Sequence, residues 1–145
     1  MGPVIAAVET TCPAMAGAAA AARLAHVLHT TLHAVHVVPA LNVLERWQPH
    51  ADAAIDQQIT TARQEMTKAL AGVLPHHDIP LLVESGPVAE RLAAAAFTWS
   101  SQHPILVLGR HARGGRRGVP GSTAYRVLGL AKVPVLVYCL AESCP

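Results

Sequence analysis

Five short, mainly apolar runs are spaced along the chain, and longer segments separate them. The runs are Val4–Val8, Leu32–Val38, Ile79–Glu84, Ile105–Leu108 and Val133–Tyr138. Their apolar residues are consecutive rather than alternating, which is typical of strands that are covered on both faces. The order of strand and helix, repeated along the chain, predicts an α/β fold of three layers. In this Rossmann-like fold an open, five-stranded, mainly parallel sheet carries helices on both faces.

The segments between the runs have helical signatures. Ala14–Leu28 is rich in alanine, and Val88–Trp99 follows a Ser85-Gly86-Pro87 turn in which Ser85 is a candidate N-cap. Ser122–Ala131 predicts the last helix. The longest helix, about six turns that end before Pro75, is indicated by apolar residues at spacings of three and four. These residues are Ile55, Ile59, Ala62, Met66, Ala69 and Val73.

Length and composition favour one globular domain over residues 1–145. The apolar fraction is 52% and only 14% of the residues are charged, which excludes a disordered chain. No apolar run reaches the roughly 18 residues that a membrane span requires, so no membrane association is expected. The three cysteines are odd in number and lack CxxC spacing, and the N-terminus has no signal-peptide pattern. We therefore expect a cytoplasmic protein.

Residues 109–122, GRHARGGRRGVPGS, lie between the fourth predicted strand and the last predicted helix. In a parallel sheet this position is the carboxyl end of a strand, where ligands bind. Glycines expose backbone N–H groups, a helix N-terminus attracts anions, and arginines add charge-assisted contacts. The loop therefore predicts a phosphate site, with the arginines Arg110, Arg113, Arg116 and Arg117. It contains no GxxxxGK[ST] motif, and its glycines do not open the first strand–helix unit as a dinucleotide fingerprint would.

The segment LVLGRHARGGRRGVPGSTAYRVLGLAKVPVLVY resembles the universal stress protein family, in which a glycine loop of this kind precedes a helix and a last strand of the type CPVLVV. VIAAVETT, LHAVHVV and ESGPVAERLAAAA resemble the first strand and turn, the second strand, and the G-x-P-x-E helix start of that family. The resemblance implies an adenine nucleotide alpha hydrolase-like fold. It also implies a dimeric stress-response protein that acts as a sensor or regulator and that binds ATP or another adenine nucleotide with Mg²⁺ on its phosphates.

Matching the motifs residue by residue gives a nucleotide site. The resemblance places the base against Ala7, Glu9 and the backbone of Val37. It places the ribose and phosphates on Leu108, Gly109, His111, Ala112, Gly121, Ser122 and Thr123. This loop has Ala112 where the family has its second glycine, and it is one residue shorter. No protein ligand for a metal ion and no catalytic residue is assigned.

The resemblance also implies a homodimer through the last strand, with Val133, Val135 and Val137 as the strand residues. An apolar strand at the edge of a sheet would otherwise invite aggregation. A further protein partner is expected, but the sequence does not identify it.

Several alternatives stay open at this point. The same cleft would suit a slow ATPase or a nucleotidyl-transfer enzyme, and a member that does not bind nucleotide would act through protein partners. Glu9 is either a general base or a residue that precedes a helix, and His111 is either a phosphate ligand or a plain loop residue. His36 is expected to be a hydrogen-bonded core residue, and the other histidines are expected at the surface or in packing. Nucleic-acid binding is disfavoured because the basic loop lacks interleaved aromatic residues.

Overall fold

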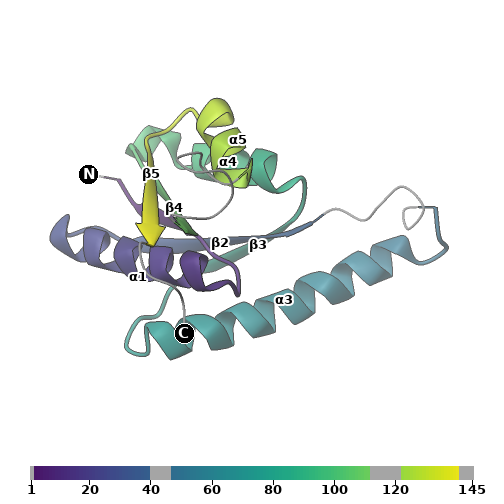
Figure 1. Ribbon diagram of the computed structural model, residues 1–145. Helices are drawn as coiled ribbons and strands as arrows, with labels where there is room; N and C mark the ends of the chain where they lie inside the picture. The colour runs from purple at the N-terminus through teal and green to yellow at the C-terminus, as the bar shows by residue number, and fades with distance from the viewer. Residues whose placement is uncertain (1, 40–46, 112–121, 141–145) are drawn as a thin grey trace.

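The computed structural model describes residues 2–39, 47–111 and 122–140. It confirms the predicted α/β fold with an open, five-stranded sheet, and all five strands are parallel (Figure 1). The strands are β1 (Val4–Ala7), β2 (Leu32–Pro39), β3 (Leu81–Gly86), β4 (Ile105–His111) and β5 (Val135–Leu140). The helices are α1 (Cys12–Val27), α3 (Ala51–Val73), α4 (Val88–Phe97) and α5 (Ser122–Leu130), with a 3₁₀ turn, η1, at Ser100–Gln102. The spatial order of the strands is β3-β2-β1-β4-β5.

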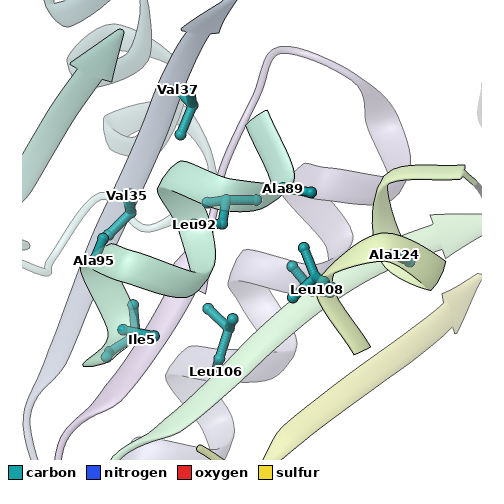
Figure 2. Packing of buried hydrophobic residues seen from close by; sticks show 11 residues of the cluster. Ile5, Val35, Val37, Ala89, Leu92, Ala95, Leu106, Leu108 and Ala124 are labelled. Carbon is teal, nitrogen blue, oxygen red and sulfur yellow. The ribbon is translucent and has the colours of Figure 1, made fainter. Parts of the chain in front are cut away.

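Helices cover the two faces of the sheet in pairs, α1 and α3 on one face and α4 and α5 on the other (Figure 1). Side chains along each strand alternate between these faces. In β1, for example, Ile5 packs toward α4 and α5, whereas Val4 and Ala6 pack toward α1 and α3. Figure 2 shows Ile5, Leu106 and Leu108 gathered beneath α4 and α5. The central strands are therefore buried on both faces, as their uninterrupted apolar sequences predict.

Helix α1 lies close to the sheet, and the most buried residues of its inner face are small. Ala18, Ala21 and Ala25 are buried against β1 and β4. At the carboxyl end of β4 two glycines meet, and a Cβ on Gly17 would lie 2.9 Å from the Gly109 Cα. The alanine-rich sequence thus allows a short distance between the helix and the sheet.

The third strand differs from its predicted range. It begins at Leu81 rather than Ile79 and continues through Ser85 to Gly86, which pairs with Pro39 of β2. The prediction of Ser85 as the N-cap of α4 was therefore wrong, because its backbone belongs to the sheet and Pro87 occupies the cap position. Gly86 has a φ of +140°, a conformation that glycine adopts without strain.

The other boundaries show smaller differences. Strand β4 runs on to His111, which pairs with Leu140. Strand β5 starts at Val135, so Val133 precedes the strand and is separated from it by Pro134, whose carbonyl accepts a hydrogen bond from Leu106 N–H. In α3 the predicted Val73 is 41% exposed, because Leu70 takes the buried position in the last turns.

None of the helices in the described residues is long and apolar enough to cross a membrane.

Candidate functional site: a cleft at the carboxyl ends of the strands

A cleft of about 200 Å³ opens at the carboxyl ends of β1, β2 and β4, beside the first turns of α1, α4 and α5. It lies where the chain order of the strands reverses, because β2 and β3 extend the sheet on one side of β1 while β4 and β5 extend it on the other. Such a switch point is the usual ligand position in an open α/β sheet. The lining residues are Ala7, Val8, Glu9, Ala14, His36, Val37, Pro39, Val88, Leu92, Leu108, Gly109, Thr123 and Ala124.

The cleft brings together residues that the sequence places far apart. Of the predicted nucleotide site, six residues line it: Ala7, Glu9, Val37, Leu108, Gly109 and Thr123. Ser122 begins α5 and His111 ends β4, next to the cleft residues Thr123 and Gly109. Predicted residues Ala112 and Gly121 and the arginines Arg113, Arg116 and Arg117 lie outside the described residues, whereas Arg110 is half-buried in β4.

The walls of the cleft are mostly apolar. Val37 and Leu108 are buried at the ends of their strands, and Leu92 of α4 lies between them, as Figure 2 shows. Ala124, in the first turn of α5, lies beside Leu108 (Figure 2). An apolar slot with a few polar groups at its rim suits a small ligand with a flat, apolar ring.

The polar groups at one end of the cleft come from the place where the pairing of β1 and β2 stops. The paired register ends at Ala7 and Val35, and one more backbone bond joins Val8 N–H to Val35 O at 2.9 Å. Backbone groups of a strand point alternately to its two neighbours, so those of Val37 point to the same side as those of Val35. Because β1 has ended there, the N–H and C=O of Val37 are directed at the cleft.

Glu9 is exposed at the rim of the cleft, just beyond β1. The Thr11 hydroxyl donates a hydrogen bond of 3.3 Å to the Glu9 carboxylate. Thr11 occupies the N-cap position of α1 but makes no side-chain cap bond. Glu9 lies two residues before the cap, so by position it is a residue that precedes a helix. Among the described residues that line the cleft, Glu9 has the only carboxylate.

Gly109 lines the cleft and also lies directly against the start of α1. A Cβ at this position would lie 1.9 Å from the Pro13 carbonyl oxygen, a backbone atom that cannot rotate away. The sequence predicts this glycine from the needs of a phosphate ligand. The structure adds a reason within the protein itself, which is the packing of the α1 start on the end of β4.

Comparison with known families and structures places these features in context. The model of the Universal stress protein family matches residues 1–138. The chain belongs to the universal stress protein family. A search of curated proteins gives no match.

Solved structures of universal stress proteins share the fold. A universal stress protein UspA from Lactobacillus plantarum is 19% identical, with a TM-score of 0.70 over 94% of this chain and 97% of that one. A universal stress protein in complex with cAMP is 16% identical, with a TM-score of 0.64 over 94% and 95%. The universal stress protein from Archaeoglobus fulgidus in complex with dAMP is 17% identical, with a TM-score of 0.54 over 94% and 97%.

Sequence reasoning missed several residues that line the cleft of this universal stress protein. Val88 and Leu92 of α4 and Ala14 of α1 belong to the first turns of helices that follow strands β3 and β1. The sequence did contain a signal for these residues, because the first turns of helices that follow parallel strands surround the carboxyl edge of the sheet. His36 was predicted as a hydrogen-bonded core residue. Its ring Nδ1 does lie 2.7 Å from Val8 O, but the residue is half-buried and not part of the core. That it also lines the cleft was not predicted.

A second hollow lies at the opposite, amino edge of the sheet, where His26, His33, His76, His77 and Asp78 gather. His33 contacts the Trp99 ring at 5.2 Å between centroids. Within residues 2–39, 47–111 and 122–140, no group of three or more His, Cys, Asp or Glu side chains is arranged to hold a metal ion.

Proposed function

We propose that this universal stress protein binds an adenine nucleotide in the cleft and acts as a nucleotide-responsive module in the stress response. The observation that carries the proposal is the convergence of Glu9, the backbone of Val37 and the apolar walls at the switch point of the sheet. These groups come from three separate strand ends and from helices on both faces. The cAMP and dAMP complexes of similar structures support an adenine nucleotide as the ligand class.

The base is assigned to the end of the cleft formed by Ala7, Glu9 and Val37. The N–H and C=O of one residue offer a donor beside an acceptor. Adenine presents the complementary pair, an acceptor at N1 and a donor at the 6-amino group, whereas guanine presents the reverse pair on the same edge. The apolar side chains of Val37 and Leu92 would contact the ring faces. This arrangement favours adenine over guanine.

The ribose and phosphates are assigned to the opposite end, along Leu108, Gly109 and Thr123 and toward residues 110–122. The N-terminus of α5 begins at Ser122, so its backbone N–H groups and the Thr123 hydroxyl lie on the side where phosphate oxygens would be bound. The proposed loop contacts are His111, Ala112, Gly121 and Ser122, together with the four arginines. ATP with Mg²⁺ held by its phosphates is the form that the resemblance favours.

Binding is favoured over efficient catalysis by the composition of the described lining. Phosphoryl transfer requires a positioned base or water-orienting group and groups that neutralise developing charge. Within the described part of the cleft, Glu9 is the single carboxylate and it is exposed. We therefore propose a sensor or regulator rather than an ATPase or a nucleotidyl-transfer enzyme.

Isothermal titration calorimetry with ATP, ADP and AMP at millimolar concentration tests the proposal, and saturable heat is expected from at least one of them. Glu9→Ala should weaken binding about tenfold, because a hydrogen bond to the ribose or base is lost. Glu65→Ala, which removes an exposed carboxylate on α3, is the matched control and should bind like the wild type. Absence of heat from all three nucleotides would refute the proposed function.

A cytoplasmic homodimer that signals to a further protein completes the proposal. Strand β5 is the edge strand next to β4 in the sheet order, and it is the segment assigned to the dimer. The side chains of Val133, Val135 and Val137 pack against the core under α4 and α5, so the backbone of β5 is what the strand would offer to a second copy.

A further inference from the structure

The imidazole of His36 lies where the pairing of β1 with β2 stops, at the end of the cleft that is assigned to the base. Its Nδ1 lies 2.7 Å from the Val8 carbonyl oxygen, and the half-buried residue lines the cleft. We propose that His36 is a positioning residue for the base, which fixes the Val8 carbonyl and so leaves the backbone of Val37 available to the ligand. This inference rests on the proposed function and adds to it a residue that the family resemblance did not assign to the site.

The chemistry of the contact defines the protonation of the ring. A carbonyl oxygen only accepts hydrogen bonds, so the Nδ1 atom of His36 must carry the proton. In the neutral ring the other nitrogen, Nε2, is then unprotonated. The contact therefore predicts a single tautomer, which is a property that can be measured without any ligand.

The register of the strands shows which backbone hydrogen bond the His36 ring replaces. In a continued parallel ladder, Val37 N–H would donate to Val8 O after Val8 N–H has bonded to Val35 O. The register instead stops at Ala7 and Val35. The Val8 carbonyl accepts from the side chain of His36, so it is satisfied without the N–H of Val37. The backbone donor and acceptor of Val37 are thereby left for a base.

The same contact holds the rim of the cleft. Val8 is fixed on both sides, by its N–H to Val35 and by its carbonyl to the His36 ring. Glu9 follows directly, so the orientation of the peptide between Val8 and Glu9 depends on this second bond. Loss of the ring donor would free the peptide and allow Val8 O to compete for the N–H of Val37.

The test compares two replacements of His36 with a control on the same strand. His36→Leu removes the donor, whereas His36→Asn places an amide N–H near the position of Nδ1. His33→Leu changes the histidine at the amino end of β2, remote from the cleft, and is the control. Calorimetry with AMP and ATP should give about tenfold weaker binding for His36→Leu. His36→Asn should bind within about threefold of the wild type, because its amide N–H retains the hydrogen bond to the Val8 carbonyl. The control should also bind within about threefold of the wild type, because it leaves His36 unchanged. Circular dichroism melts verify that all variants are folded.

The outcomes separate this inference from the proposed function. If the wild type binds adenine nucleotide and His36→Leu binds equally well, or if Asn fails to rescue, the positioning role is overturned while the proposed function stands. If the wild type binds none, both are overturned. Nitrogen-15 NMR of the ligand-free protein should show a proton on the ring Nδ1, and a neutral ring that carries its proton on Nε2 would overturn the contact itself.

Discussion

Replacing Gly109 with alanine should lower the free energy of unfolding by about 3 kcal/mol, because the new methyl group has no space to occupy. Its carbon would lie 1.9 Å from Pro13 O and 3.1 Å from Ala14 Cα. Both are atoms of the main chain at the start of α1, so no side-chain rotation relieves the clash. The helix must move away from β4, and the buried contacts of Gly17 and Ala18 would be weakened with it.

Urea denaturation followed by circular dichroism measures this loss, and Gly72→Ala provides the matched control. Gly72 lies in α3, where an added Cβ meets nothing within 4 Å. The same chemical change should there raise the free energy of unfolding by about 0.5–1 kcal/mol, because alanine favours the helix and restricts the unfolded chain. Equal midpoints for Gly109→Ala and the wild type would contradict the close contact of α1 with β4.

Gly109 also illustrates what the sequence could and could not predict. The glycine-rich stretch indicates a site, and its first residue, Gly109, lines the cleft. Yet a glycine pattern does not distinguish a residue that faces phosphate from one that admits a neighbouring helix. The second role depends on the distance between α1 and β4, which only the assembled fold defines.

The strands were predictable because each reads as a mainly apolar run, and the central strands β1 and β4 are buried on both faces. The ends of the strands were less predictable, because they are defined by strand pairing rather than by the polarity of the residues. Ser85 and Gly86 look like a turn but complete the ladder with Val38 and Pro39. Val133 looks like a strand residue but precedes the first pair of β5 with β4.

In the site, too, some residues were predictable from the sequence and others depend on the assembled fold. Glu9 and Val37 were predicted from the family resemblance, and the structure brings both to one cleft. The role of His36 could not be predicted, because it depends on where the pairing of β1 stops relative to β2. A histidine within an apolar strand indicates only that its ring has a partner. The identity of that partner, the Val8 carbonyl, follows from the register.

The open edge of the sheet decides how a homodimer would form. Leu106 N–H donates to Pro134 O, so the backbone of Pro134 points to β4. By alternation along the strand, the groups of Leu136 and Tyr138 also face β4, and those of Val135, Val137 and Cys139 face the open edge. Among the described strands none pairs with β5 on this side, and edge groups of this kind form a template for a second strand.

Cys139→Pro should therefore convert the proposed dimer to a monomer while the fold is retained. Proline removes one N–H that faces the edge, and it leaves the ladder with β4 intact because that position does not donate to β4. The Cys139 side chain is exposed and forms no disulfide, so little packing is lost.

Light scattering after gel filtration at micromolar concentration, with reductant present, should give twice the chain mass for the wild type and the single chain mass for the variant. Cys139→Ser keeps the N–H and should remain dimeric. A monomeric wild type would refute the dimer, and a dimeric proline variant would refute pairing through this edge.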